Sequence, residues 1–73
     1  MYVNLRYELM VKRISQRCMA DKLGIGPNTM SEKMTRKKDF KLQECLKIKK
    51  ILNTDLPVEE LFKWKDVEHE VLS

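Results

Sequence analysis

A very short connection between two helix-forming segments is the feature that most limits how this chain can fold. Ser15 can cap the first segment, and Gly24 can end it, since glycine readily adopts the left-handed conformation of a helix stop. Pro27 then starts the next segment almost at once, because proline needs no N–H in a first helical turn. The sequence predicts helices over residues 16–23 and 27–35 that cross steeply and pack together.

Three further helices are predicted around this pair, which gives an all-α domain of five helices. Asn4 can cap a helix over about residues 5–12, and Pro57 can start one over residues 57–66. The remaining helix, over residues 42–52, is expected to turn Leu46, Ile48, Ile51 and Leu52 inward, with Cys45 beside them.

Charge is distributed unevenly along the chain. Residues 1–53 contain 13 Lys or Arg and 5 Asp or Glu, a balance of +8, whereas residues 54–73 contain 2 and 6, a balance of −4. A basic body fits a polyanionic partner such as nucleic acid, although a solvated basic face gives the same pattern. We expect one domain over residues 1–73, with residues 64–73 as an acidic C-terminal extension.

The two cysteines are expected to stay reduced. Cys18 and Cys45 lie inside predicted helices and can serve in part as small core residues. No metal site or cofactor is predicted, because two Cys and the distant His69 do not form a zinc ligand set. Residues 1–10 do not read as a secretory signal, and no segment is apolar enough to span a membrane, so a cytoplasmic location is expected.

An ordered set of residues carries a family resemblance over about residues 4–63. It comprises Gln16, Met19, Ala20, Leu23, Gly24, Ile25, Asn28, Thr29, Met30, Ser31, Lys33, Met34, Asp39, Phe40, Lys41, Leu42, Leu46, Ile48, Leu52, Val58, Glu59, Glu60, Leu61 and Phe62. In this order and spacing the chain resembles the lambda-repressor-like helix-turn-helix domains, the Cro and phage-repressor type also called the xenobiotic-response-element family. The resemblance implies a compact five-helix domain whose third helix enters the major groove of DNA.

The outward face of the third predicted helix carries the candidate base-reading residues Pro27, Asn28, Ser31 and Glu32. The resemblance places Pro27, Asn28 and Glu32 at positions that usually face bases, and Gln16 at one that binds phosphate. Further phosphate contacts are expected from Arg17, Thr29, Thr35, Arg36, Lys37 and Lys38.

These residues also have structural interpretations. Asn28 can satisfy the start of its helix, and Glu32 can pair with Arg36 one turn later. Arg13 and Arg36 both stand where the family commonly has glycine, so the turn after the third helix is expected to differ. Gly26 replaces a frequent Ser or Thr cap.

A homodimer on a palindromic operator is expected, at least on DNA, because one such domain reads only a few base pairs. Trp64, Val67 and Val71 recur at helical spacing and form the candidate dimer surface. In the alternative, Trp64 and Val67 fold back onto the first helix near Tyr2 and Leu5.

The pattern as a whole favours a small transcriptional regulator of double-stranded DNA, repressor-like and of phage or bacterial origin. The second class is a protein-interaction or antitoxin-type module that keeps a helix-turn-helix as its scaffold. An enzyme is not expected, because the chain offers one His and no convincing pair of nucleophile and base. The run from Gly24 to Gly26 also does not complete a phosphate-binding loop.

Overall fold

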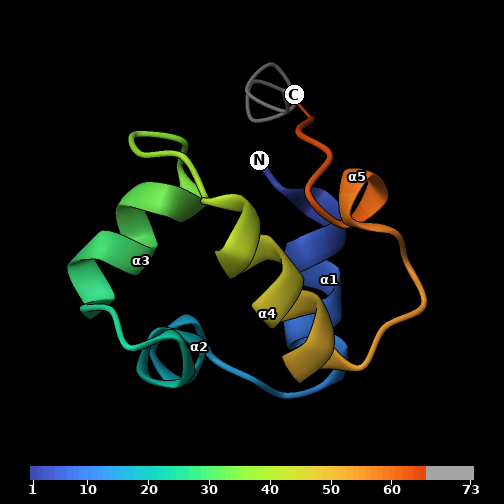
Figure 1. Cartoon of the computed structure of the whole chain (residues 1–73), viewed down its shortest axis with the longest axis horizontal. Helices are drawn as coiled ribbons and strands as arrows, with labels where there is room; N and C mark the ends of the chain where they lie inside the picture. Colours follow the sequence, from blue (N-terminus) through green and yellow to red (C-terminus); the bar gives the residue numbers. More distant parts are fainter. Residues whose placement is uncertain (66–73) are drawn as a thin grey trace, which may run out of the picture.

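Five α-helices joined by short loops make up residues 1–65, the part of the chain described by the structure, a computed structural model (Figure 1). They are α1 (Val3–Val11), α2 (Gln16–Leu23), α3 (Pro27–Met34), α4 (Leu42–Leu52) and α5 (Val58–Leu61). Within these residues no β-strand forms, and the one β-type pairing is an antiparallel bridge between Tyr2 and Trp64. The all-α fold class expected from the sequence is confirmed.

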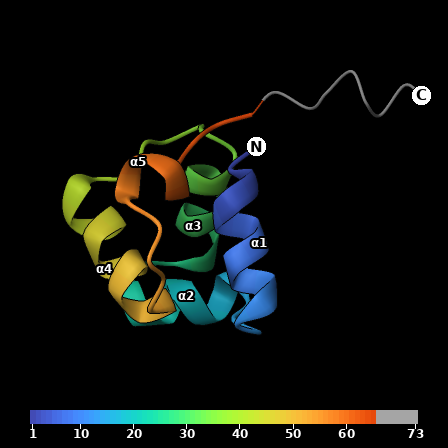
Figure 2. The same cartoon turned by 90° about the vertical axis from the view of Figure 1, so that its right-hand side faces the viewer.

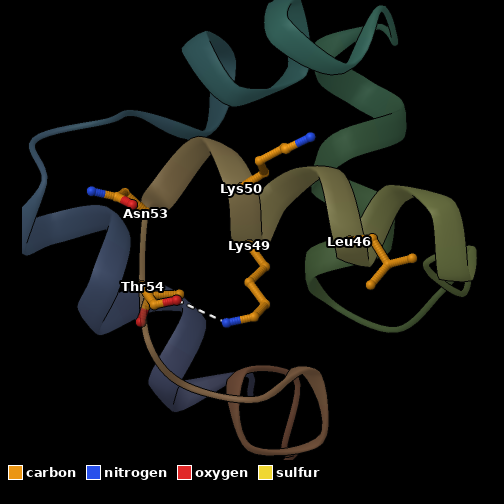
Figure 3. Close-up of a pocket in the computed structure, with 5 residues that line it drawn as sticks. All are labelled: Leu46, Lys49, Lys50, Asn53 and Thr54. Carbon is orange, nitrogen blue, oxygen red and sulfur yellow. Dashed lines mark hydrogen bonds between the residues drawn. The ribbon is translucent and has the colours of Figure 1, made fainter.

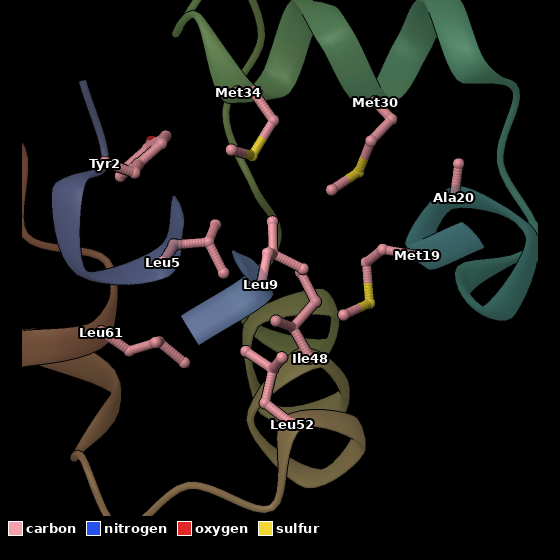
Figure 4. Close-up of a cluster of buried hydrophobic side chains, with 10 residues drawn as sticks. All are labelled: Tyr2, Leu5, Leu9, Met19, Ala20, Met30, Met34, Ile48, Leu52 and Leu61. Carbon is pink, nitrogen blue, oxygen red and sulfur yellow. The ribbon is translucent and has the colours of Figure 1, made fainter. Parts of the chain in front are cut away.

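All five helices contribute apolar side chains to one buried cluster (Figure 4). Its members are Tyr2, Leu5, Leu9, Met19, Ala20, Met30, Met34, Ile48, Leu52 and Leu61. Met19, Met30 and Met34 bring α2 and α3 into this cluster, and unbranched methionine side chains adapt well to irregular gaps. Because α3 turns Met30 and Met34 inward, its opposite face is left to solvent.

The connection between α2 and α3 follows the local signals in the sequence. Ser15 Oγ accepts a hydrogen bond from the Cys18 N–H at 3.0 Å, which caps α2. Gly24 ends α2 with a φ of +75°, and Pro27 is the first residue of α3. In Figure 1, α2 is seen nearly along its axis while α3 runs across the view, so the helices cross steeply. Ala20, fully buried, leaves room for this close approach.

The first helix starts earlier than expected and has no side-chain cap. α1 begins at Val3 rather than Leu5, and Tyr2 is its N-cap residue. Asn4, the expected cap, lies inside the helix, where its Nδ2 donates a hydrogen bond to the carbonyl oxygen of Glu60 at 2.7 Å. Asn4 therefore ties α1 to α5, a contact between residues far apart in the sequence.

Two side chains expected in the core are exposed. Leu46 is 52% exposed, because α4 turns Cys45, Ile48 and Leu52 inward and leaves Leu46 on the other side. Cys18 is exposed as well. Both cysteines are free thiols, and burial raises the pKa of the Cys45 thiol.

The fifth helix ends at Leu61, so the expected helix over residues 57–66 is too long. After it the chain brings Phe62 and Trp64 against Tyr2, with ring centroids 5.8 and 5.0 Å away in edge-on arrangements. Such edge-to-face aromatic pairs contribute about 0.5–1.5 kcal/mol each beyond the burial of their area. This packing, together with the bridge between Tyr2 and Trp64, replaces the last turns of the expected helix.

The shorter helix removes the basis on which the C-terminal dimer surface was predicted. Trp64 does not lie on a helix, and it is half-buried against Tyr2, as in the alternative in which it folds back. Val67 and Val71, the other members of that surface, lie outside the described residues.

An ion pair between the buried Lys33 and the half-buried Glu44 joins α3 to α4. Lys33, only 6% exposed, places its Nζ 2.8 Å from Glu44 Oε1 and donates a second hydrogen bond to the Asp39 carbonyl at 3.1 Å. The same Glu44 oxygen accepts a hydrogen bond from the Lys41 N–H at 2.9 Å, in the first turn of α4. The pair fixes the inner face of α3 to the start of α4.

This pair makes stability depend on pH. Burial alone would raise the pKa of Glu44, but hydrogen bonds from Lys33 and Lys41, together with their charges, outweigh it and hold the pKa below its ordinary value of 4.5. A carboxyl whose pKa is lower when folded adds stability above its unfolded pKa. That contribution is lost as the pH falls from about 4.5 through the folded pKa.

We predict that Lys33→Met lowers the free energy of unfolding at pH 7 by about 2–3 kcal/mol, because it leaves a largely buried carboxylate without its charge partner. The loss should shrink as the pH is lowered below 4.5, where Glu44 becomes protonated. Urea unfolding of both proteins at a series of pH values measures this difference.

Lys38→Met is the matched control, because it breaks an ion pair to Glu32 whose side chains are 57% and 42% exposed. Exposed pairs contribute about 0–1 kcal/mol. Equal losses in the two variants, or a loss for Lys33→Met that does not change with pH, would contradict a stabilising role for the ion pair of Lys33 with Glu44.

Candidate nucleic-acid interface

The face of α3 opposite the core carries short polar side chains. Pro27, Asn28 and Ser31 are exposed, and Glu32 and Thr29 are half-buried beside them. The structure therefore brings the four expected base-reading residues together on one face of one helix. Because Pro27 is the first residue of α3, its missing N–H removes no hydrogen bond from the helix.

Glu32 has an ion-pair partner, but not the expected one. Its Oε1 lies 3.2 Å from Lys38 Nζ, whereas Arg36 points elsewhere. The backbone at Lys37 and Lys38 folds back on α3, since both N–H groups donate to the Glu32 carbonyl, at 2.9 and 3.2 Å. Lys38 thus compensates a negative charge on a face that is otherwise suited to a polyanion.

Arg36 takes a backbone conformation that favours glycine. Its φ is +65°, in the left-handed region, and Arg13 at the other such position has a φ of +58°. The guanidinium of Arg36 lies 4.9 Å from the centre of the Trp64 ring, a cation–π arrangement. The turn after α3 therefore has the backbone conformation of a glycine turn, although Arg36 stands there.

Thr35 and Lys37, two other expected phosphate ligands, differ in whether their side chains are already bonded within the domain. The Thr35 hydroxyl lies 3.1 Å from the Ser31 carbonyl and 3.2 Å from the Glu32 carbonyl, so its one proton is already used inside α3. Lys37 is exposed and forms no ion pair with any of residues 1–65. Lys37 is therefore the better phosphate ligand of the two.

The start of α2 offers backbone donors. Gln16 and Arg17 occupy its first turn and are exposed. Their N–H groups precede the first bonds inside the helix and have no partner among residues 1–65, whereas the Cys18 N–H is taken by Ser15. Free N–H groups at a helix N-terminus favour anions such as phosphate.

A hollow of about 390 Å³ lies along α4 and the loop after it (Figure 3). Its lining residues are Leu46, Lys49, Lys50, Asn53 and Thr54. Lys49 donates a hydrogen bond to the Thr54 carbonyl at 2.8 Å, whereas Lys50 points away from it. Because the polar groups do not converge on one point, this hollow lacks the arrangement that fixes a small ligand.

Two contacts that support this surface from behind have no signal in the local sequence. The family resemblance includes Lys33, but nothing near Lys33 in the sequence shows that it is buried beside Glu44. Trp64 packs on Tyr2, as in the alternative in which it folds back, but its contact with Arg36 joins residues 28 positions apart.

Comparison with protein-family models, with curated proteins and with solved structures gives no significant match to this chain. Among residues 1–65, no three His, Cys, Asp or Glu side chains gather closely enough to hold a metal ion. In the same part of the chain no helix is both long and apolar enough to cross a membrane.

We predict that Arg13→Gly raises the free energy of unfolding by about 1 kcal/mol, because a left-handed conformation costs a residue with a Cβ about 1–2 kcal/mol. Arg36→Gly should raise it less, because that change also removes the contact with Trp64. Urea unfolding of the two variants and the unchanged protein tests both. An equal gain in both variants would show that the contact of Arg36 with Trp64 adds no stability.

Proposed function

We propose that this protein binds double-stranded DNA by placing α3 in the major groove, and that it acts as a small transcriptional regulator of the Cro or repressor type. The observation that carries the proposal is the exposed face of α3. It presents Pro27, Asn28 and Ser31 outward on a helix whose other side is fixed by Met30 and Lys33. A rigid helix with short polar side chains on its open face is suited to base edges.

Four side chains read bases in this proposal, and three of them are free to do so. Asn28 has the donor and acceptor needed for a paired contact with adenine, and Ser31 can donate to or accept from either kind of base. Pro27 offers an apolar contact with a thymine methyl group. Glu32 accepts from a cytosine amine only if its bond to Lys38 opens or is shared, so its contact is the weakest of the set.

Phosphate contacts hold α3 in register. The free N–H groups of Gln16 and Arg17 offer one anion position, and the Lys37 ammonium offers another. Arg36 contributes through the edges of a guanidinium held over Trp64, and Lys38 contributes less because Glu32 compensates it. The Thr35 hydroxyl binds a phosphate only if it gives up its hydrogen bond inside α3, and Thr29 only if its half-buried hydroxyl becomes accessible.

Two copies on a palindromic site complete the proposal. One α3 reaches only a few base pairs, and two-fold proteins of this kind read two half-sites about one DNA turn apart. The two copies need not associate without DNA, because neighbouring half-sites hold them side by side.

The test begins with selection of bound duplexes from a random pool, followed by titration of the best duplex at several salt concentrations. Log affinity should fall linearly with log salt, with a slope of about −0.9 per neutralised phosphate. Lys37→Ala should make that slope less steep by about 1 and weaken all duplexes alike. Asn28→Ala should cost about 1–3 kcal/mol at one base pair and relax the preference there.

Lys47→Ala is the matched control, because Lys47 is also an exposed cation but lies on α4. It should leave the salt slope and the base preference unchanged. The proposal fails if no duplex binds at low salt. The assignment of α3 as the reading helix fails if Asn28→Ala weakens every duplex equally.

A further inference from the structure

α1 is apolar on both of its sides. Leu5 and Leu9 face the core, yet Tyr7, Met10 and Val11 on the outer side are 59%, 69% and 51% exposed. An ordinary surface helix places polar residues on its outer side, and a helix that is apolar all round is usually covered on all sides. The outer side of α1 therefore has the composition of a surface that a partner covers.

The outer side of α1 is also hollowed. A depression of about 340 Å³ is lined by Met1, Val3, Arg6, Tyr7 and Met10. Four of these residues, at positions 3, 6, 7 and 10, have the spacing of the hole that accepts one side chain of a facing helix. The depression therefore fits an apolar side chain that projects from a second helix.

Cations lie within this surface and at its C-terminal end: Arg6 lines the depression, and Lys12 and Arg13 follow the last residue of α1. Arg6, Lys12 and Arg13 are exposed, and none of them forms an ion pair with any of residues 1–65. The one carboxylate on α1 is Glu8. If two copies met through this side, the three cations of one copy would face the three cations of the other, and each copy would supply only Glu8 to balance them. Self-association through this side is therefore electrostatically unfavourable. A partner with Asp and Glu beside its apolar residues is complementary.

We propose that the outer side of α1 binds an amphipathic helix of another protein, whose apolar stripe is bordered by acidic residues. Tyr7, Met10 and Val11 contact the apolar stripe, and Arg6, Lys12 and Arg13 pair with its carboxylates. This is the helix-in-groove mode, in which apolar anchors give affinity and charges give orientation.

This surface is separate from the proposed DNA interface. In Figure 1, α3 lies at the left of the domain and α1 lies to the right of its centre. In Figure 2, where the right-hand side of Figure 1 faces the viewer, α3 lies behind α1 and is drawn fainter. No residue of the α1 stripe belongs to α3, to residues 36–38 or to the first turn of α2. A partner helix on the apolar residues of α1 therefore does not compete with DNA for α3. The inference does not depend on DNA binding, and it is tested without DNA.

The probe is a synthetic 14-residue helical peptide with Leu at positions of spacing i, i+3, i+4, i+7 and Glu at the flanking positions. A second peptide carries Lys in place of each Glu. Isothermal titration of the full chain should show binding of the Glu peptide and none of the Lys peptide. Met10→Glu should weaken binding about tenfold or more, and Arg6→Glu should weaken it as well.

Leu46→Glu is the matched control, because Leu46 is 52% exposed on α4 beside the cations Lys49 and Lys50. It should bind the Glu peptide as the unchanged chain does, and thermal unfolding should show that all variants remain folded. The inference is overturned if the Glu peptide does not bind, or if Leu46→Glu loses as much affinity as Met10→Glu.

Two results that assign this surface to a different occupant would also overturn the inference. Sedimentation that shows a dimer abolished by Met10→Glu would assign the surface to a second copy. Peptide binding that appears only after removal of residues 66–73 would assign it to the chain's own C-terminal end.

Discussion

The ammonium group of Lys33 lies between α3 and α4 and holds the two helices together through Glu44 and the carbonyl of Asp39, 2.8 and 3.1 Å away. A buried cation is costly unless it is paired and hydrogen-bonded, and here both conditions are met. The position of α3 is thereby fixed from its inner side by one charge and by Met30 and Met34. A helix fixed in this way can present its other face without using any residue of that face for stability.

The turn after α3 is also held in place by contacts on its inner side. Arg36 adopts a backbone conformation that is costly for a residue with a Cβ, and Trp64 stacks beneath its side chain. Trp64 in turn packs on Tyr2 and pairs with its backbone. The start of the chain, the segment after α5 and the turn after α3 thus meet in one aromatic cluster, which supports the surface that we propose to bind DNA.

Local chemistry explains what the sequence predicted well. The cap at Ser15, the stop at Gly24 and the start at Pro27 act within a few residues, so the bounds of α2 and the start of α3 are read directly. The outward grouping of Asn28 and Ser31 follows from helical spacing once Met30 is placed inside. Long-range contacts explain the rest, since the hydrogen bond from Asn4 to Glu60, the burial of Lys33 and the packing of Trp64 on Tyr2 join distant residues. The spacing of apolar residues predicts that the fifth helix continues past Leu61, because spacing does not account for the packing of Phe62 and Trp64 on Tyr2.

The central claim is that α3 is the element that meets DNA. The most direct measurement is the change in backbone amide chemical shifts of the labelled protein on addition of a duplex selected from a random pool. The account predicts the largest changes in α3, in residues 36–38 and at Gln16 and Arg17, with little change along the outer side of α1. Changes confined to α4 or to α1, with α3 unaffected, would contradict it.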